Sequence, residues 1–212
     1  INGTPVEDVV ISDISGDLLD TKGARIVATY NGKQGTLLDD SKYDYPREKG
    51  TVQAWVNIKK TTSYPGIVHA GILSDFTDEA WTLQLLSNNT PGFAVAGQTP
   101  YEYDLVQSTQ RLNLDTWYYL AATWDLSADS IKIYVNGALR GSARFSKVSA
   151  GDLLTTKSPV VVGSQLYDGS QVLKSYYGFD GKINGVLIDT RVWSPDDIKA
   201  FYDVNQANTA SW

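Results

Sequence analysis

The chain has 212 residues, 24 acidic against 18 basic side chains, a formal net charge of −6, and no cysteine or methionine. Without cysteine it has no disulfide framework and no thiol chemistry. The acidic balance argues against a nucleic-acid partner, which needs a basic surface. No apolar run is long enough to insert into a membrane, and we expect a segment of a longer polypeptide.

Short runs of β-branched and aromatic residues, separated by glycine and polar turns, predict strands through the first half of the chain. The predicted strands are Val9–Ile11, Arg25–Tyr30, Thr51–Ile58, Ile67–Leu73, Trp81–Ser87, Gly92–Gly97 and Val106–Leu112. In Thr51–Ile58 the side chains of Val52, Ala54, Val56 and Ile58 fall on one face, which indicates a strand with one face in the core.

The centre of the chain predicts a three-stranded meander. Its strands are Trp117–Asp125, Ile131–Asn136 and Ala138–Phe145, with a polar turn between the first two. Asn136-Gly137 joins the second pair. Asn-Gly favours a type I′ hairpin turn, because both central residues of that turn need a positive φ.

Two further strands and one helix complete the predicted elements. The strands are Pro159–Ser164 and Phe179–Trp193. The helix is expected at Pro195–Val204, since Ser194 can cap it and proline is favoured at the first helical position. The pattern predicts an all-β fold over residues 1–212, a single two-sheet antiparallel β-sandwich with one short C-terminal helix, a size that such sandwiches commonly reach.

Three blocks of sequence carry a resemblance to a known superfamily. They are T-V-Q-A-W-V at Thr51–Val56, the meander Trp117–Gly141, and F-D-G-K-I-N-G-V-L-I-D-T-R-V-W-S-P-D-D-I at Phe179–Ile198. In this order they resemble the concanavalin A-like lectin/glucanase jelly rolls, and most nearly the laminin-G-like (pentraxin-like) branch. The resemblance implies a jelly-roll sandwich. It does not settle function, because this fold hosts lectins, adhesins, hydrolases and lyases.

Catalysis is not expected from the carboxylates. Glycosidases of the family-16 type on this fold place their catalytic carboxylates on one strand, in the pattern E-x-D-x-x-E. The nearest match here has Glu102 and Asp104 but Gln107 in place of the second glutamate. Glutamine cannot protonate a leaving group. We therefore expect Glu102 and Asp104 to be a solvated acidic pair in the loop after Pro100.

The only histidine, His69, also gives no catalytic pattern. Lyases of the alginate type on this fold use a Gln-x-His strand, and Ile67 stands where the glutamine would be. No nucleophile-elbow motif is present either. A packed strand histidine is the interpretation we favour, so we expect no enzymatic activity in this chain.

The resemblance implies a structural calcium ion. Many members of the superfamily bind one where an N-terminal loop meets the closing strand, with an aspartate in G-x-I-D as a ligand. Here the matching residue is Asn184, whose carbonyl could still bind Ca²⁺. Asp13, Asp17 and Asp20 in the early acidic loop could supply the charge.

Ligand binding is expected at loops, because sandwiches present ligands on loops or on the concave sheet. Three loops combine aromatic rings with carboxylates: Ser74–Glu79, Pro100–Asp104 and Gln165–Gly178. Tyrosine can stack on a sugar ring while acidic groups accept bonds from hydroxyls. The candidate ligand-binding residues are Phe76, Asp78, Tyr101, Glu102, Tyr103, Tyr167, Asp168, Tyr176 and Tyr177.

These observations favour a non-catalytic carbohydrate-binding module of a larger secreted or surface protein, extracellular or at the cell surface, with a glycan as partner. Two alternatives stay open. One is a protein-binding, adhesion or spacer domain of a surface protein or viral fibre. The other is a hydrolase or lyase on the same fold, resting on Glu102 and Asp104 alone.

Overall fold

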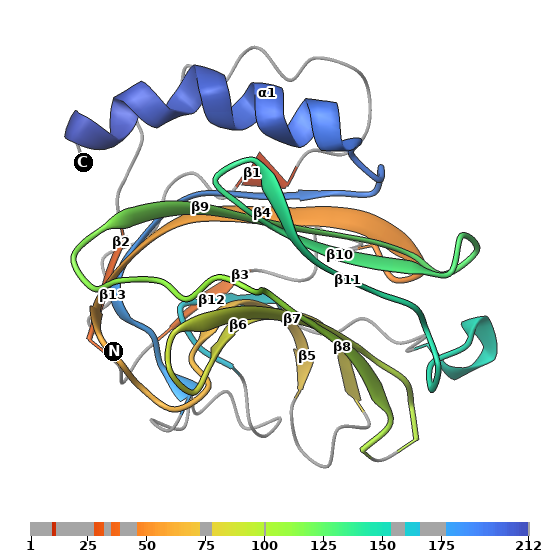
Figure 1. The fold of residues 1–212 in the computed structure, drawn as a ribbon. Coiled ribbons are helices and arrows are strands. Elements are labelled where there is room, and N and C mark those ends of the chain that lie inside the picture. Colours follow the sequence, from red (N-terminus) through yellow and green to blue (C-terminus); the bar gives the residue numbers. More distant parts are fainter. Residues whose placement is uncertain are drawn as a thin grey trace.

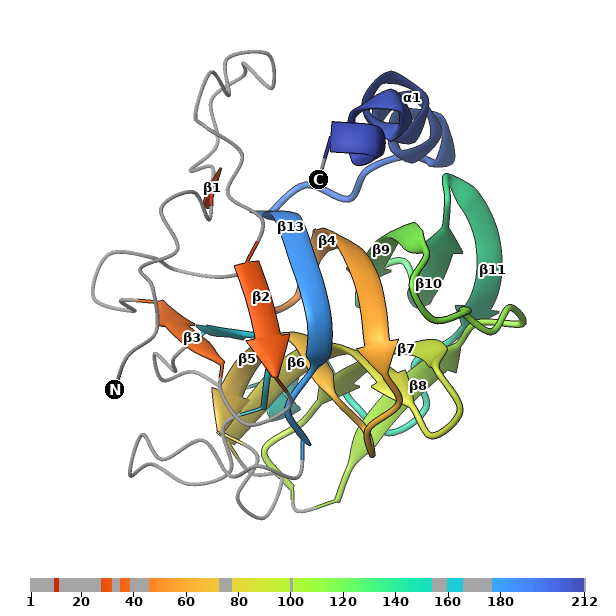
Figure 2. The same ribbon diagram turned by 90° about the vertical axis from the view of Figure 1, so that its left-hand side faces the viewer.

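Two β-sheets packed face to face make up the computed structural model, which describes residues 10–11, 28–31, 35–38, 46–72, 78–99, 101–153, 160–165 and 177–211 (Figures 1 and 2). The seven-stranded sheet has the order β1-β13-β4-β9-β10-β11, with β2 also paired to β13. Its strands are β1 (Val10–Ile11), β2 (Ala28–Asn31), β4 (Lys49–Lys60), β9 (Trp117–Asp125), β10 (Ser130–Val135), β11 (Ala138–Ala143) and β13 (Asp180–Asp189). The six-stranded sheet has the order β3-β12-β5-β6-β7-β8. Its strands are β3 (Thr36–Leu38), β5 (Gly66–Ile72), β6 (Asp78–Leu86), β7 (Thr90–Ala96), β8 (Tyr103–Gln107) and β12 (Val160–Val162).

Neighbouring strands pair antiparallel, apart from the short parallel pair β1–β13. The helices are α1 (Pro195–Asn205), η3 (Ala150–Asp152) and η5 (Gln206–Ser211). The predicted two-sheet β-sandwich with a short C-terminal helix is therefore confirmed. None of the helices in the described part of the chain is long and apolar enough to cross a membrane.

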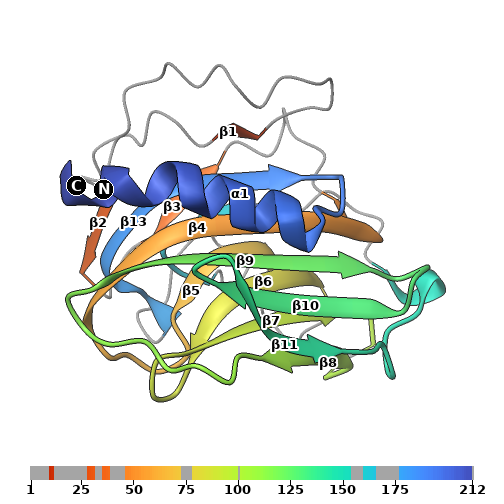
Figure 3. The same ribbon diagram turned by 45° about the horizontal axis from the view of Figure 1, so that its top comes forward.

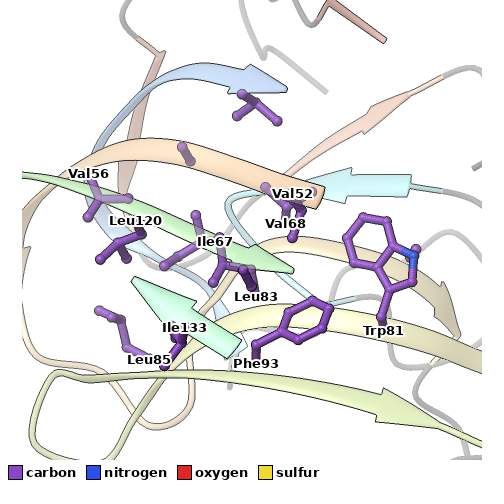
Figure 4. Packing of buried hydrophobic residues seen from close by; sticks show 14 of the residues in the cluster. Val52, Val56, Ile67, Val68, Trp81, Leu83, Leu85, Phe93, Leu120 and Ile133 are labelled. Atoms are coloured by element: carbon purple, nitrogen blue, oxygen red, sulfur yellow. The ribbon is translucent and has the colours of Figure 1, made fainter. Parts of the chain in front are cut away.

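The main core lies between the sheets and follows the alternation of the strands. The predicted inward face of β4 is almost completely buried. The labelled side chains in Figure 4 belong to this cluster: Val52, Val56, Ile67, Val68, Trp81, Leu83, Leu85, Phe93, Leu120 and Ile133. Burial of one such large side chain contributes about 1.5–3 kcal/mol. The indole N–H groups of Trp81 and Trp124 donate to the carbonyls of Pro46 and Arg47, both at 2.8 Å, so neither buried ring leaves its donor unpaired.

The central meander forms as predicted. β9 pairs with both β4 and β10, and β10 continues into β11 through Asn136 and Gly137, with φ of 52° and 75°. A Cβ at Gly137 would lie 3.2 Å from the Cα of Lys199 and from the ring of Tyr202. The hairpin tip thus needs glycine both for its backbone conformation and for its contact with α1.

Helix α1 covers the outer face of the seven-stranded sheet (Figure 3). Ser194 accepts from the backbone N–H of Asp197, whose carboxylate in turn accepts from the N–H of Ser194, a capping box that defines the start of the helix. A second aromatic cluster lies beneath it, where Tyr202 stacks on Trp55 at 5.8 Å and Phe201 on Tyr119 at 5.5 Å. The aromatic residues of this face are therefore packing residues.

Several strands differ from the sequence prediction in their bounds, and β3 was not predicted; side-chain hydrogen bonds explain two of the differences. The strand expected at Val106–Leu112 is β8, which begins and ends earlier, at Tyr103 and Gln107. Ser108 ends it, because its hydroxyl accepts from the N–H of Gln110 and donates to the carbonyl of that residue. The closing strand ends at Asp189 rather than Trp193, because the carboxylate of Asp189 binds the backbone and guanidinium of Arg191 and the indole of Trp193.

Candidate functional site

The outer face of the six-stranded sheet is concave, since its strands arch toward the other sheet (Figure 1). In β8, the edge strand, Asp104 pairs with the core residue Val95, so the alternate residues Tyr103, Leu105 and Gln107 point outward. All three side chains reach solvent, and Leu105 is 37 % exposed. We call these three residues, together with Tyr101 in the preceding turn, the β8 strip.

Small residues lie beside the β8 strip. Gly92, Ala94 and Ala96 of β7 pair with Gln107, Leu105 and Tyr103 in register. Farther across the face, His69 and Thr82 are buried. Along the β8 edge of this face, an aromatic ring, an aliphatic chain and an amide follow one another beside the small side chains of β7.

Tyr101 is the most exposed aromatic residue of the strip, at 66 %. It lies in the β7–β8 turn with φ of 63°, a left-handed conformation that costs a bulky residue about 1–2 kcal/mol. Two hydrogen bonds close the turn, from the N–H of Gly97 to the carbonyl of Glu102 and from the N–H of Glu102 to that of Thr99. The turn holds an aromatic ring outward at a conformational cost, a pattern found at functional sites.

Asp104 ties the turn and β8 to a distant segment. Its carboxylate accepts from the backbone N–H groups of Ser146, Lys147 and Val148 at 2.9–3.0 Å and from the Ser146 hydroxyl at 2.7 Å. Burial acts to raise the pKa of Asp104, but the bonds from Lys147, Ser146 and Val148 outweigh it and hold that pKa below its usual value. Asp104 is only 5 % exposed, so the expectation of a solvated acidic pair is wrong for this residue.

Gln98 makes a second connection to the same segment. Its backbone N–H donates to the carbonyl of Asp152, and its side-chain amide donates to the carbonyl of Leu153, both at 2.6 Å. Asp152 also accepts from Ser149 at the start of η3. Residues 146–153 are therefore attached to the β8 edge at two points.

One basic side chain of this segment reaches the strip. The ammonium of Lys147 lies 5.3 Å from the centroid of the Tyr103 ring, a cation–π distance. Lys147 was not among the residues that the sequence suggested, and S-K-V contains no signal that could have indicated it. Its role follows from the Asp104 bonds to its own backbone and to its neighbours.

Of the remaining candidates, only Asp78 and Tyr177 are among the described residues. Phe76, Tyr167, Asp168 and Tyr176 lie outside the described residues. Asp78 opens β6 opposite Ile72, at the same end of the sheet as Tyr101. Tyr177 lies toward the opposite end of the sheet. The N–H of Phe179, two residues later, donates to the carbonyl of Gly163, and the N–H of Gly163 donates to the carbonyl of Ile67. The described candidates that come together are Tyr101, Glu102 and Tyr103.

Asn184, the expected calcium ligand, is 5 % exposed in β13 opposite Trp55, next to a bulge in which Gly185 has φ of 57°. Within the described part of the chain, its Nδ2 has no hydrogen-bond partner. Asp13, Asp17 and Asp20 lie outside the described residues. The described residues contain no group of three or more histidine, cysteine or acidic side chains that could hold a metal, so an ion that takes six to eight oxygens would need ligands besides Asn184.

His69 is a packed strand histidine, as expected. Its side chain is 0 % exposed in β5 between Val161 and Thr82. Burial lowers the pKa of His69 to about 4, although a hydrogen bond with the Gly71 backbone acts to raise it. The imidazole is neutral at physiological pH.

Comparison with known protein families gives a match over most of the chain. Residues 26–199 match the model of the concanavalin A-like lectin/glucanases superfamily. The chain belongs to this superfamily. The match includes the three sequence blocks that carried the resemblance, and the two-sheet architecture is the one that the resemblance implied. A search of curated proteins found no match.

Solved structures share the superfamily fold at low sequence identity. The CBM40 of the Ruminococcus gnavus IT-sialidase has a TM-score of 0.66 at 16% identity, over 85% of this chain and 97% of that one. Domain 4 of an extracellular GH43 arabinanase from Geobacillus stearothermophilus, in complex with arabinotriose, has a TM-score of 0.55 at 15% identity, over 85% and 82%. A heptameric SAP-like pentraxin from Limulus polyphemus has a TM-score of 0.57 at 13% identity, over 73% and 70%. At these identities the likeness concerns the fold alone.

Proposed function

We propose that this chain is a carbohydrate-binding domain that acts on no bond of its ligand, and that the β8 strip is its contact surface. The observation that carries the proposal is Tyr101, an exposed ring held in a left-handed turn that two connections to residues 146–153 make rigid. A tyrosine face can cover the apolar face of a sugar ring, and Gln107 can bond its hydroxyls. Support comes from similar structures with bound sialyllactose and arabinotriose.

The absence of catalysis is part of the proposal. A glycosidase needs two carboxyl groups that can exchange protons or attack the sugar. Asp104 is buried and accepts four hydrogen bonds from residues 146–148, so it is committed to holding the loop. Gln107, exposed on the strip, supplies an amide where the glutamate of the hydrolase pattern would be.

Replacement of Tyr101 by glycine tests the proposal. We expect the affinity for the best ligand of a glycan panel, measured by calorimetric titration, to fall about tenfold, ~1.4 kcal/mol, since tyrosines of this kind dominate contact surfaces. The melting temperature is expected not to fall, because glycine adopts φ of 63° without strain.

Tyr64→Gly is the matched control. Tyr64 is also exposed, at 46 %, and also left-handed, with φ of 48°, but it precedes β5 at the opposite end of the sheet. It should bind like the unaltered chain. If Tyr64→Gly weakens binding as much as Tyr101→Gly, or if the folded chain binds no glycan, the β8 strip is not the site; retention of a protein ligand alone would favour an adhesion role.

We also propose a structural Ca²⁺, with Asp13, Asp17, Asp20 and Asn184 as ligands. A bound ion would hold loops and perform no chemistry. At a calcium concentration a hundredfold above Kd, binding contributes about 2.7 kcal/mol, which raises the melting temperature by about 5–11 °C. Differential scanning fluorimetry with Ca²⁺, Mg²⁺ and EGTA measures this, and identical curves in Ca²⁺ and EGTA would remove calcium from the proposal.

Location and context complete the proposal. We place the chain in a secreted or cell-surface protein, as one part of a longer polypeptide. Support comes from two of the similar structures, which are named as a module of a sialidase and a domain of an extracellular arabinanase. Detection of the parent protein in the culture medium or at the cell surface tests this.

A further inference from the structure

The position of Lys147 bears on the chemical class of the ligand. Its side chain is exposed, and its ammonium lies over the Tyr103 ring at 5.3 Å. Among the described residues it forms no ion pair; the ion pairs there involve Arg144, Arg191 and Lys199. The charge is therefore available to a ligand.

Lys147 is also held in place. Asp104 accepts from the backbone N–H of Lys147 itself at 2.9 Å and from those of both neighbours at 3.0 Å. All four hydrogen bonds to Asp104 come from backbone N–H groups and the Ser146 hydroxyl, so that carboxylate does not pair with the ammonium. A residue whose backbone is anchored before binding loses less conformational freedom when a ligand arrives.

The cation also divides the roles of the two tyrosines. Lys147 occupies one face of the Tyr103 ring, so the more exposed ring of Tyr101 is the better candidate for stacking on a sugar. An acidic chain with net charge −6 does not attract anions through its overall charge. A local ammonium on an anchored backbone, beside an exposed ring, suits recognition of a sugar with a charged substituent.

From this geometry we propose that the β8 strip binds an anionic sugar, with the ring on Tyr101 and a carboxylate or sulfate on Lys147. This inference rests on the proposed carbohydrate binding and names its ligand class. Lys147 is a specificity-determining residue in this arrangement. Glu102, the neighbouring carboxylate in the turn, opposes an anion, so Glu102→Gln should tighten binding of the acidic ligand.

The test uses matched pairs of oligosaccharides that differ in charge: lactose with 3′-sialyllactose, and an oligogalacturonide methyl ester with its free acid. In calorimetric titrations the unaltered chain should bind the acidic member of at least one pair about tenfold more tightly than the neutral member. Added NaCl should reduce that preference, because an exposed ion pair is screened.

Three variants locate the effect. Lys147→Gln should lose the preference and keep the affinity for the neutral member, whereas Lys147→Arg should retain the preference. Lys182→Gln removes an equal charge from an exposed position in β13, on the other sheet, and should bind like the unaltered chain.

Two results would overturn the inference while leaving carbohydrate binding intact. One is equal affinity for both members of each pair that binds. The other is a preference for the acidic member that persists in Lys147→Gln. Failure of the folded chain to bind any sugar, neutral or acidic, would overturn the proposed function and this inference with it.

Discussion

Replacement of Asp104 by alanine is expected to lower the free energy of unfolding by about 3–4 kcal/mol, because a buried acceptor of several charge-assisted hydrogen bonds disappears. Three backbone N–H groups, of Ser146, Lys147 and Val148, lose their partner together. The N–H of Val148 is the most costly of these, because Val148 is buried and water cannot replace the carboxylate there. Urea denaturation followed by tryptophan fluorescence measures the change.

Two variants separate the charge of Asp104 from its shape. Asp104→Asn keeps one oxygen acceptor but turns an amide toward N–H donors, so its loss of stability should be smaller than that of the alanine variant and still clear. Glu102→Gln changes a carboxylate in the same turn that is only partly buried, and should stay within about 0.5 kcal/mol. A loss below about 1 kcal/mol in Asp104→Ala would contradict the anchoring role.

The same variant links stability to binding. Asp104 points to the opposite face of β8 from Tyr103 and Leu105, yet it holds the backbone of Lys147, which carries the cation over Tyr103. Release of residues 146–148 should therefore weaken a ligand that uses Lys147 more than one that uses Tyr101 alone. Asp104 is in this sense a positioning residue.

Local patterns predicted the frame of the protein well. The Asn136-Gly137 turn depends on two residues with positive φ, and the start of α1 depends on Ser194, Pro195 and Asp197. Interactions over a few residues determine such features, so the sequence shows them directly. The alternation of inward and outward side chains in β4 could be predicted equally well, because every inward side chain from Val52 to Ile58 is apolar.

The site was less predictable because its interactions are distant in sequence. Asp104 is separated by 42–44 residues from the backbone N–H groups of residues 146–148 that donate to its carboxylate. Nothing in Y-E-Y-D-L-V-Q distinguishes such an aspartate from a solvated one. Likewise, β8 was expected too late in the chain, because Tyr103 and Leu105 point outward and Ser108 ends the strand. The turn at Tyr101 could be suggested as a binding loop, but its cationic neighbour could not.

Stability is expected to fall by about 3 kcal/mol as the pH drops from about 6.5 to about 4, because His69 is buried as the neutral imidazole. The pKa of His69 is lowered to about 4 in the folded chain, while the unfolded chain binds a proton near 6.5. Between these values the unfolded state holds the extra proton, so acidification favours unfolding. The contribution is fully present above pH 6.5.

His69 is the only histidine of the chain, so no other imidazole titrates in this interval. The depressed pKa values of Asp104 and Asp189 place their losses of stability at lower pH, below the usual aspartate range near 3.8. Urea denaturation at several pH values between 7 and 4.5 should give a slope in the unaltered chain that is absent in His69→Gln, whatever the stability of that variant at pH 7. The His69 imidazole resonance supplies an independent measurement, and a folded-state titration near pH 6.5 would contradict the burial on which the prediction rests.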